Sequence, residues 1–403
     1  MKKILAIILL TGTIFSCTNN NSEKKADTTE VKQLASPVAD SSAEPFLFTD
    51  KNGTVYLSWI EKIGKENKLK FSSLVNDQWK EPSVIAAGNN WFVNWADYPM
   101  LASNGNDLMA HILQKSADGK YTYDVKLITS ADKGQSWSDL KILNADGKNA
   151  EHGFVSLMPF GDQFFVSWLD GRNTVSEGDD TTAHHEGHQG AMSLRGAVVN
   201  KQGTKTAEWE LDNRVCDCCQ TSTALTANGP VVVYRNRSEE EIRDMAIVRF
   251  VNGKWTEPKI IFPDEWKIAG CPVNGPRASA EGNNLAIAWF SSPDKKAQVN
   301  IIFSDDGGAS FSKPIRIDED NAIGRVDVVM LNDKSAMVSW MEGAVIKAAR
   351  VNKNGTKDSS IVIASSSESR SSGFPQMTKS GNNLIFAWTD DKEKTIKVAK
   401  LAL

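Results

Sequence analysis

The stretch QFFVSWLD, from Gln163 to Asp170, is an apolar strand pattern with a tryptophan near its end. The same pattern occurs in seven copies, and the aligned aromatic positions, with His111 in the second copy, are 48 to 66 residues apart. The other six copies read TVYLSWIE (54–61), DLMAHILQ (107–114), PVVVYRN (230–236), NLAIAWFS (284–291), SAMVSWME (335–342) and NLIFAWTD (383–390). A strand pattern that returns at such intervals indicates a fold built from repeats.

Each copy is flanked by further apolar segments, so one repeat contains four strands. In the first copy they are PFLFTD, TVYLSWIE, KLKFSSLV and WKEPSVIA. No long amphipathic helix pattern separates the copies. Four-stranded units of this length predict an all-β propeller, and we count seven blades. The last copy has only three strands, and a segment within 31–38 is expected to supply the fourth and close the ring.

Two turns share the pattern S-x-D-x-G-x-S-[WF], from Ser130 to Trp137 and from Ser304 to Phe311. The carboxylate suits a turn that caps backbone N–H groups, and the glycine suits a position with positive φ. The motif resembles the Asp-box, or BNR repeat, of sialidases and other extracellular carbohydrate-active propellers. The resemblance covers most of residues 43–403. It implies six blades as the alternative count, and Asp-box turns on the face opposite the active site.

The N-terminus resembles a bacterial lipoprotein signal. Lys2 and Lys3 precede an apolar run that ends at Ser16-Cys17, which implies lipid attachment at Cys17. Residues 18–42 are polar and read as a disordered tether, and residues 43–403 as the propeller. We therefore expect a monomer in the cell envelope, anchored in the membrane by its lipid. The formal net charge of −4 does not suggest a nucleic-acid partner.

The repeat register places the inter-blade loops and the loops between second and third strands on one face, around the channel mouth. Seven of the twelve arginines fall there, and a guanidinium suits carboxylate, sulfate or phosphate. The candidate ligand-binding residues are Arg172, Arg235, Arg237, Arg243, Arg277, Arg325, Arg370, Trp95 and Asn274. They predict binding of an acidic saccharide or another anionic ligand. The alternative for each arginine is an ion pair with a loop carboxylate that braces the loop.

The sialidase resemblance implies three arginines on a substrate carboxylate, a Tyr–Glu nucleophile pair and an aspartic acid/base. Asp97 and Asp170 are the candidate proton donors, and Tyr98 is the candidate nucleophile. The chain departs from the family because no arginine precedes Arg172 and no tyrosine lies in the last two blades. An exo-α-sialidase-like hydrolase and a glycan or protein receptor without turnover therefore both stay open.

The run Cys216-Asp217-Cys218-Cys219 gives a different hypothesis, a metal-binding or redox protein on the same propeller. With Cys271 it contains every cysteine except Cys17, and all four lie in consecutive inter-blade loops. Thiolate and imidazole ligands suit copper or zinc, and the candidate imidazoles are His152, His184, His185 and His188. The other interpretation is a pair of disulfides, Cys216–Cys271 and Cys218–Cys219, as is common in exported proteins.

Overall fold

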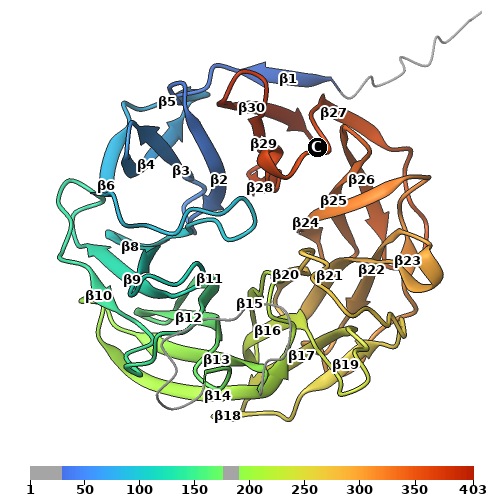
Figure 1. The fold of residues 1–403 in the computed structure, drawn as a ribbon. Helices are drawn as coiled ribbons and strands as arrows, with labels where there is room; N and C mark the ends of the chain where they lie inside the picture. The colour runs from blue at the N-terminus through green and yellow to red at the C-terminus, as the bar shows by residue number, and fades with distance from the viewer. Residues whose placement is uncertain (1–29, 176–189) are drawn as a thin grey trace, which may run out of the picture.

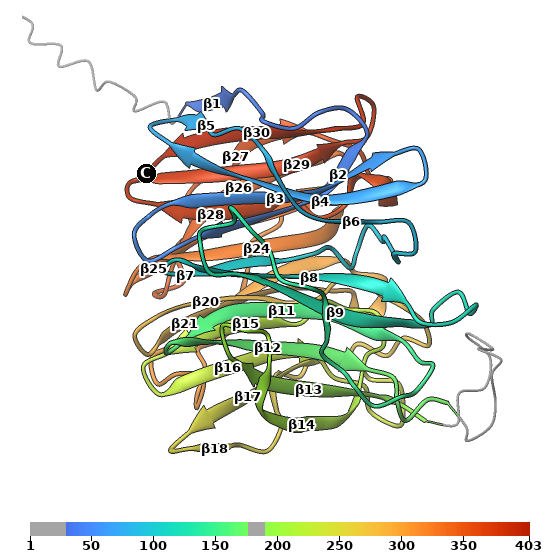
Figure 2. The same cartoon turned by 90° about the vertical axis from the view of Figure 1, so that its left-hand side faces the viewer.

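The computed structural model describes residues 30–175 and 190–403, which form seven antiparallel sheets arranged in a ring (Figure 1). This confirms the all-β propeller and its seven blades, so the six-bladed alternative is wrong. Figure 2 shows the ring from the side, with loops projecting from both ends of the strands. Cys17, His184, His185 and His188 lie outside the described residues.

The strands follow one another blade by blade. The first three blades contain β2 (Ser42–Thr49), β3 (Val55–Ile63), β4 (Glu66–Val75), β5 (Gln78–Trp79) and β6 (Ser83–Gly88); β7 (Leu101–Asn104), β8 (Asp107–Lys115), β9 (Tyr123–Ser130) and β10 (Lys141–Ile142); and β11 (His152–Phe160), β12 (Gln163–Asp170), β13 (Met192–Val199) and β14 (Lys205–Val215). In the first blade, β5 and β6 both pair with β4 and share the outermost position.

The remaining four blades follow the same order. They contain β15 (Ser222–Thr226), β16 (Gly229–Arg235), β17 (Met245–Val251), β18 (Lys254–Trp255) and β19 (Lys259–Phe262); β20 (Arg277–Glu281), β21 (Asn284–Ser291), β22 (Gln298–Ser304) and β23 (Ile315–Arg316); β24 (Ala322–Asn332), β25 (Ser335–Glu342), β26 (Val345–Asn352) and β27 (Ile361–Ser365); and β28 (Gln376–Ser380), β29 (Asn383–Asp390), β30 (Thr395–Ala402) and β1 (Val31–Leu34). Two short 3-10 helices, η1 (Pro293–Lys295) and η2 (Arg370–Ser372), lie in the loops.

The repeated tryptophan strand is the second strand of each blade, and it is buried on both faces. In β25, for example, every residue from Ser335 to Glu342 is buried. Neighbouring blades cover the two faces of each sheet, which explains why these strands are almost continuously apolar. The aligned aromatic positions are Trp59, Trp168, Tyr234, Trp289, Trp340 and Trp388, with His111 in the second blade, and all are at most 4% exposed. The apolar core therefore lies between the blades.

The ring closes through the N-terminal segment. β1 pairs antiparallel with β30, with Val31 opposite Leu401 and Leu34 opposite Val398. The closing strand lies within the expected segment, so the last blade combines the first and the last strands of the described chain (Figure 1). This pairing covers the edge of β30 that an open ring would leave exposed.

The two Asp-box turns have the expected geometry. The Asp132 carboxylate accepts hydrogen bonds from the Ser136 N–H at 2.9 Å and from the Ser130 hydroxyl at 2.8 Å. Gly134 has φ +85°, and a Cβ atom there would lie 2.4 Å from the Phe71 ring of the preceding blade. The turn therefore needs glycine both for its backbone conformation and for its packing. Asp306 makes equivalent bonds to Ser310 and Ser304.

Candidate functional site

The inter-blade loops meet at one end of the central channel, opposite the Asp-box turns, because alternate loops of an antiparallel blade emerge at opposite ends. Gln220, in the loop before β15, ties three of them together. Its side-chain amide donates to the Ala96 carbonyl at 2.6 Å, and its carbonyl accepts from the Gly275 N–H at 2.9 Å. The neighbouring Thr221 hydroxyl donates to the Phe154 carbonyl at 3.0 Å. The loops thus form a cross-linked mouth around the channel.

A cavity of about 240 Å³ lies between these loops, and we call it the mouth pocket. Its lining residues are Asn94, Trp95, Ala96, Tyr121, Glu151, Phe154, Asp217, Cys218, Cys271, Val273 and Arg370. They come from the inter-blade loops before β7, β11, β15, β20 and β28, from the start of β11 and from the loop between β8 and β9. The pocket therefore combines aromatic rings, two carboxyl groups, two thiols and one guanidinium.

The two carboxyl groups of the mouth pocket have different partners. Glu151 accepts a hydrogen bond from the buried Tyr123 hydroxyl at 2.7 Å. Burial raises the pKa of Glu151 to about 8, although this hydrogen bond acts in the opposite direction. Asp217 forms an ion pair with Arg237 at 2.9 Å, and burial outweighs this charge and raises the pKa of Asp217. Glu151 is therefore protonated at neutral pH and can donate a hydrogen bond.

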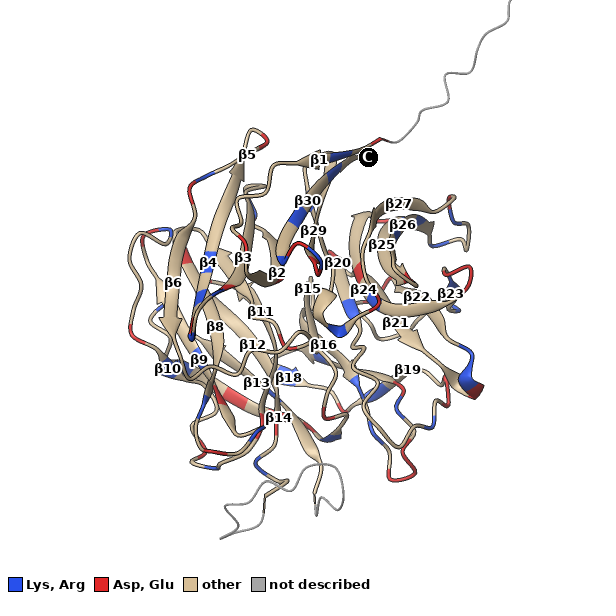
Figure 3. Cartoon of the chain, turned by 45° about the horizontal axis from the view of Figure 1, so that its top comes forward, with Lys and Arg blue, Asp and Glu red and all other residues tan. Residues whose placement is uncertain are grey.

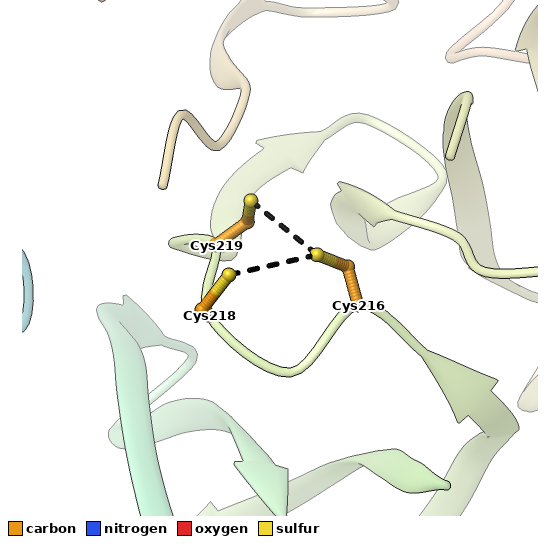
Figure 4. Close-up of side chains that lie close together, drawn as sticks. All are labelled: Cys216, Cys218 and Cys219. Atoms are coloured by element: carbon orange, nitrogen blue, oxygen red, sulfur yellow. Dashed lines mark hydrogen bonds between the residues drawn. The ribbon is translucent and has the colours of Figure 1, made fainter. Parts of the chain in front are cut away.

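The thiol groups gather next to the same pocket (Figure 4). The Cys216 sulfur lies 3.6 Å from that of Cys219 and 4.0 Å from that of Cys218. Cys271, from the next inter-blade loop, lines the mouth pocket together with Cys218. The structure contains neither of the expected disulfides, because all four of these cysteines are free. Burial opposes ionisation of Cys216, but hydrogen bonds from the other two thiols and the charge of Arg243 lower its pKa well below the usual value.

The channel itself holds a polar cluster that joins four blades. Arg277 donates to Asp327 at 3.0 Å, to the Tyr98 hydroxyl at 3.1 Å and to the Gln376 side-chain carbonyl at 3.4 Å. Tyr98 precedes β7, and Arg277, Asp327 and Gln376 lie on β20, β24 and β28, the first strands of their blades. Burial raises the pKa of Tyr98, although the charge of Arg277 opposes the shift. A raised pKa disfavours Tyr98 as a nucleophile.

Asp97 is buried beside this cluster. One carboxylate oxygen accepts the Phe154 N–H at 2.8 Å, and the other has no hydrogen-bond partner among the described residues. Burial raises the pKa of Asp97 to about 7, and the Phe154 N–H opposes the shift. A Cβ atom on Gly153 would lie 2.2 Å from the unpartnered oxygen, so the glycine allows the carboxyl group to approach the backbone.

Asp170 and His152 belong to a separate buried network. Asp170 accepts bonds from the Arg172 Nε at 2.7 Å and from the Trp168 ring N–H at 2.8 Å. Burial opposes ionisation, but the Arg172 hydrogen bonds and the charge of His152 lower the pKa of Asp170, so it is a poor proton donor. The His152 ring contacts the Asp146 carboxylate at 2.8 Å and the Tyr123 carbonyl at 3.1 Å. It does not lie with the cysteines, which removes it from the expected thiolate–imidazole set.

Most of the predicted ligand-binding arginines brace the loops. Arg235 and Arg325 are buried, and they donate to backbone carbonyls, among them those of Asn274 and Gly373. Arg237 and Arg243 both contact Glu241 at 2.7 Å. These guanidinium groups, like that of Arg172, are already bonded to carbonyls or carboxylates of the protein. They therefore fit the alternative interpretation, in which the arginines brace the loops. Segments coloured for Lys and Arg and for Asp and Glu are scattered over the strands and loops of the ribbon (Figure 3).

Arg370, Trp95 and Asn274 complete the predicted set. Arg370 is exposed, lines the mouth pocket and makes no side-chain hydrogen bond or ion pair within 30–175 and 190–403. Trp95 lines the pocket and stacks on Phe374. The Arg325 guanidinium lies over its ring, 5.3 Å from the ring centroid. The Asn274 side chain accepts the Arg325 N–H at 2.8 Å, so it orients a loop.

Sequence reasoning did not assign roles to Glu151 and Asp217, which line the mouth pocket, or to Tyr123, which bonds to Glu151. Tyr123 begins a third strand, where the register suggests a core residue. Glu151 directly precedes His152, which the sequence suggested as a metal ligand. The pair could have been predicted from two features. Glu151 lies in an inter-blade loop, and Tyr123 is an aromatic residue at one end of a strand that reaches the same face. The Tyr–Glu pair differs from the one implied by the family, because Tyr123 is fully buried and cannot reach a substrate.

Comparisons with known proteins establish the fold. The polysaccharide lyase Uly1 aligns over 90% of this chain and 90% of its own, with a TM-score of 0.55 and 10% identity. The α-L-arabinanase of Penicillium chrysogenum, solved with arabinobiose, aligns over 92% of this chain and 98% of its own, with a TM-score of 0.50 and 11% identity. The NanB sialidase of Streptococcus pneumoniae aligns over 92% of this chain and 70% of its own, with a TM-score of 0.48 and 11% identity. Identities this low transfer no activity.

No family model matches the sequence, and no curated protein matches it either. In the part of the chain that the structure describes, no helix has the length and apolar character needed to span a bilayer.

Proposed function

We propose that this protein binds an acidic saccharide in the mouth pocket. The observation that carries the proposal is the composition of the pocket wall. An exposed guanidinium without a partner among the described residues, that of Arg370, shares a cavity of about 240 Å³ with aromatic rings and a protonated carboxyl group. A cavity with convergent polar groups at the end of a rigid scaffold is the usual form of a ligand site.

Each element of the wall has a matching group on such a ligand. The Arg370 guanidinium offers a planar pair of donors to a carboxylate. The Trp95 ring offers a flat apolar surface for one face of a sugar ring. Glu151 can donate a hydrogen bond to a sugar oxygen while it holds its proton. The names of two structural neighbours, a polysaccharide lyase and an arabinanase, support saccharide as the ligand class.

The binding test compares acidic and neutral sugars. We expect sialylated or uronic-acid oligosaccharides to bind the full chain more tightly than neutral oligosaccharides, as measured by calorimetric titration. Arg370→Ala should lower the affinity for the acidic ligands by about 10- to 100-fold, since a hydrogen bond to a charged group contributes about 1.5–3 kcal/mol. Arg350→Ala is the matched control, because Arg350 lies on β26 and does not line the pocket. Equal affinity of Arg370→Ala and the parent chain would refute the proposal.

Hydrolysis of the bound saccharide is a second candidate function, favoured by the raised pKa of Glu151. A general acid must hold its proton at the working pH, and Glu151 does so below about pH 8. Asp217 is the second carboxyl group of the pocket, and two carboxyl groups flanking the bond are what most glycosidases use. Sugar release that disappears in Glu151→Gln while ligand affinity persists would establish turnover.

A further inference from the structure

Three thiol groups of one short turn lie close together, with Cys216 facing the other two (Figure 4). The turn lies between β14 and β15 and contains Cys216, Cys218 and Cys219. Their sulfur atoms all lie within 4.8 Å of one another, and the Cys216 sulfur lies 3.6 Å from that of Cys219 and 4.0 Å from that of Cys218. The next inter-blade loop brings a fourth thiol, that of Cys271, to the same pocket wall as Cys218, outside the group of three sulfurs. The sulfurs therefore come from two loops that the ring closure holds side by side.

These separations match the edges of a metal–thiolate polyhedron. Zinc–sulfur bonds of about 2.3 Å in a tetrahedron place the sulfurs about 3.8 Å apart, between the two measured values. A disulfide needs its sulfurs at about 2.05 Å, which would require the turn to rearrange. Cys216 and Cys219 are buried, so two of the sulfurs are shielded from solvent, while Cys218 and Cys271 line the mouth pocket. An ion can enter from the pocket and meet a preformed set of sulfurs.

The charges around the turn suit an anionic thiolate centre. The Arg243 Nη1 donates to the Cys216 sulfur at 3.1 Å. The guanidinium of Arg235 also lies near enough to favour negative charge on Cys216. Guanidinium groups that point at sulfur stabilise the negative charge that remains when several thiolates bind one cation. Since both arginines are buried, this arrangement does not depend on exposed charges that salt would screen.

We propose that Cys216, Cys218, Cys219 and Cys271 bind one thiophilic closed-shell ion, Zn(II) or Cu(I), at the wall of the mouth pocket. Each thiol that coordinates releases its proton to solvent, so the ion is taken up without oxidation or reduction. The Asp146–His152–Asp170 group does not compete for this role. Its oxygen and nitrogen atoms are hydrogen-bonded to Arg172, Trp168 and Tyr123.

The test uses the full chain, reduced and kept free of oxygen. In one arm Zn(II) is titrated against a chromophoric zinc chelator, and in the other Cu(I) is titrated against a copper(I) chelator. We expect one ion per chain in at least one arm, and protection of the cluster thiols from a thiol reagent on binding. Co(II) should give the sulfur-to-metal charge-transfer absorption of thiolate ligation.

The variants separate the cluster from other cysteines and from folding. Cys218→Ser and Cys219→Ser should each lower the affinity for the ion by more than about 100-fold. Cys17→Ser is the control, since Cys17 is the one cysteine outside the cluster, and it should bind as the parent does. Circular dichroism of each variant checks that the sheets are retained. Acidic-saccharide binding, measured on the same samples, reports the proposed function separately.

Three results would overturn the proposal. One is the absence of binding in both arms while all the thiols react freely. Another is metal affinity that Cys218→Ser and Cys219→Ser leave unchanged. The third is a purified chain that holds no ion and has a mass lower by four hydrogens, because two disulfides would then occupy the cluster.

Discussion

Asp97 illustrates how a single buried carboxyl group can couple folding to pH. It is 3% exposed, one of its oxygens has no hydrogen-bond partner in the described part of the chain, and burial raises its pKa to about 7. An unfolded aspartate has its ordinary pKa near 3.9. Between these two values the folded state keeps a proton that the unfolded state has lost. The unfolding free energy contributed by this group therefore falls as pH rises from about 4 to about 7.

Asp97→Asn should remove this dependence. The amide stays neutral, so the variant should gain stability relative to the parent as pH rises, by on the order of 3 kcal/mol between pH 4 and pH 8. Urea unfolding of both chains at several pH values measures the difference, and other titrating groups cancel in the comparison. Asp118→Asn, at an exposed loop residue, is the control for the change from carboxyl group to amide. A difference between Asp97→Asn and the parent that does not vary with pH would contradict the inferred protonation.

At the level of secondary-structure elements, β1 is the strand on which ring closure depends. Its four residues pair with β30 across the junction between the first and last parts of the chain. Val31 and Leu34 are partly buried, against the core clusters of the seventh blade and of its junction with the first. Removal of β1 would expose the edge of β30 and the apolar residues beneath it.

A chain that begins at Ala35 should be less stable than one that begins at Glu30. The loss should be about 2 kcal/mol, from two half-buried aliphatic side chains, and the exposed edge should promote association. Urea melts give the stability, and light scattering gives the aggregation. The chain that begins at Glu30 is the control, because it lacks only residues outside the described structure. If both truncated chains melt alike, β1 does not hold the ring.

For the molecule as a whole, Arg277 connects blades across the channel. Its guanidinium contacts residues of the second, sixth and seventh blades from a position in the fifth. Asp327, its ion-pair partner, is 3% exposed and also accepts the Met377 N–H at 2.7 Å. Loss of the arginine would leave a buried carboxylate without its countercharge.

Arg277→Ala should therefore lower the unfolding free energy by about 3 kcal/mol. Arg350→Ala, which removes an arginine that has no ion pair within the described ranges, should cost less than 1 kcal/mol. Tryptophan fluorescence in a urea series follows both variants, since the repeated core position is a buried tryptophan in five of the seven blades. An Arg277→Ala melt that coincides with the control would show that the cluster does not hold the ring together.

Much of the fold could be predicted from the sequence, because its signals are local. The alternation of turns and apolar strands, the recurring core aromatic and the Asp-box residues all act within a few residues of chain. The blade count followed from the number of copies. The closing strand could also be predicted from the sequence, since an incomplete last blade needs one more strand. The candidate site was only partly predictable: the loops were identified, but the roles of their residues were not.

The sequence by itself thus determined a seven-bladed propeller and the group of loops at its channel mouth. Only the tertiary structure decided which arginines are occupied by carbonyls and carboxylates, leaving Arg370 exposed at the pocket. It also placed His152 with aspartates, and Cys271 at the same pocket wall as Cys218. The physical reason is that strand formation depends on neighbours along the chain. Charge pairing, burial and sulfur contacts depend on groups from different blades, which become neighbours only when the ring closes.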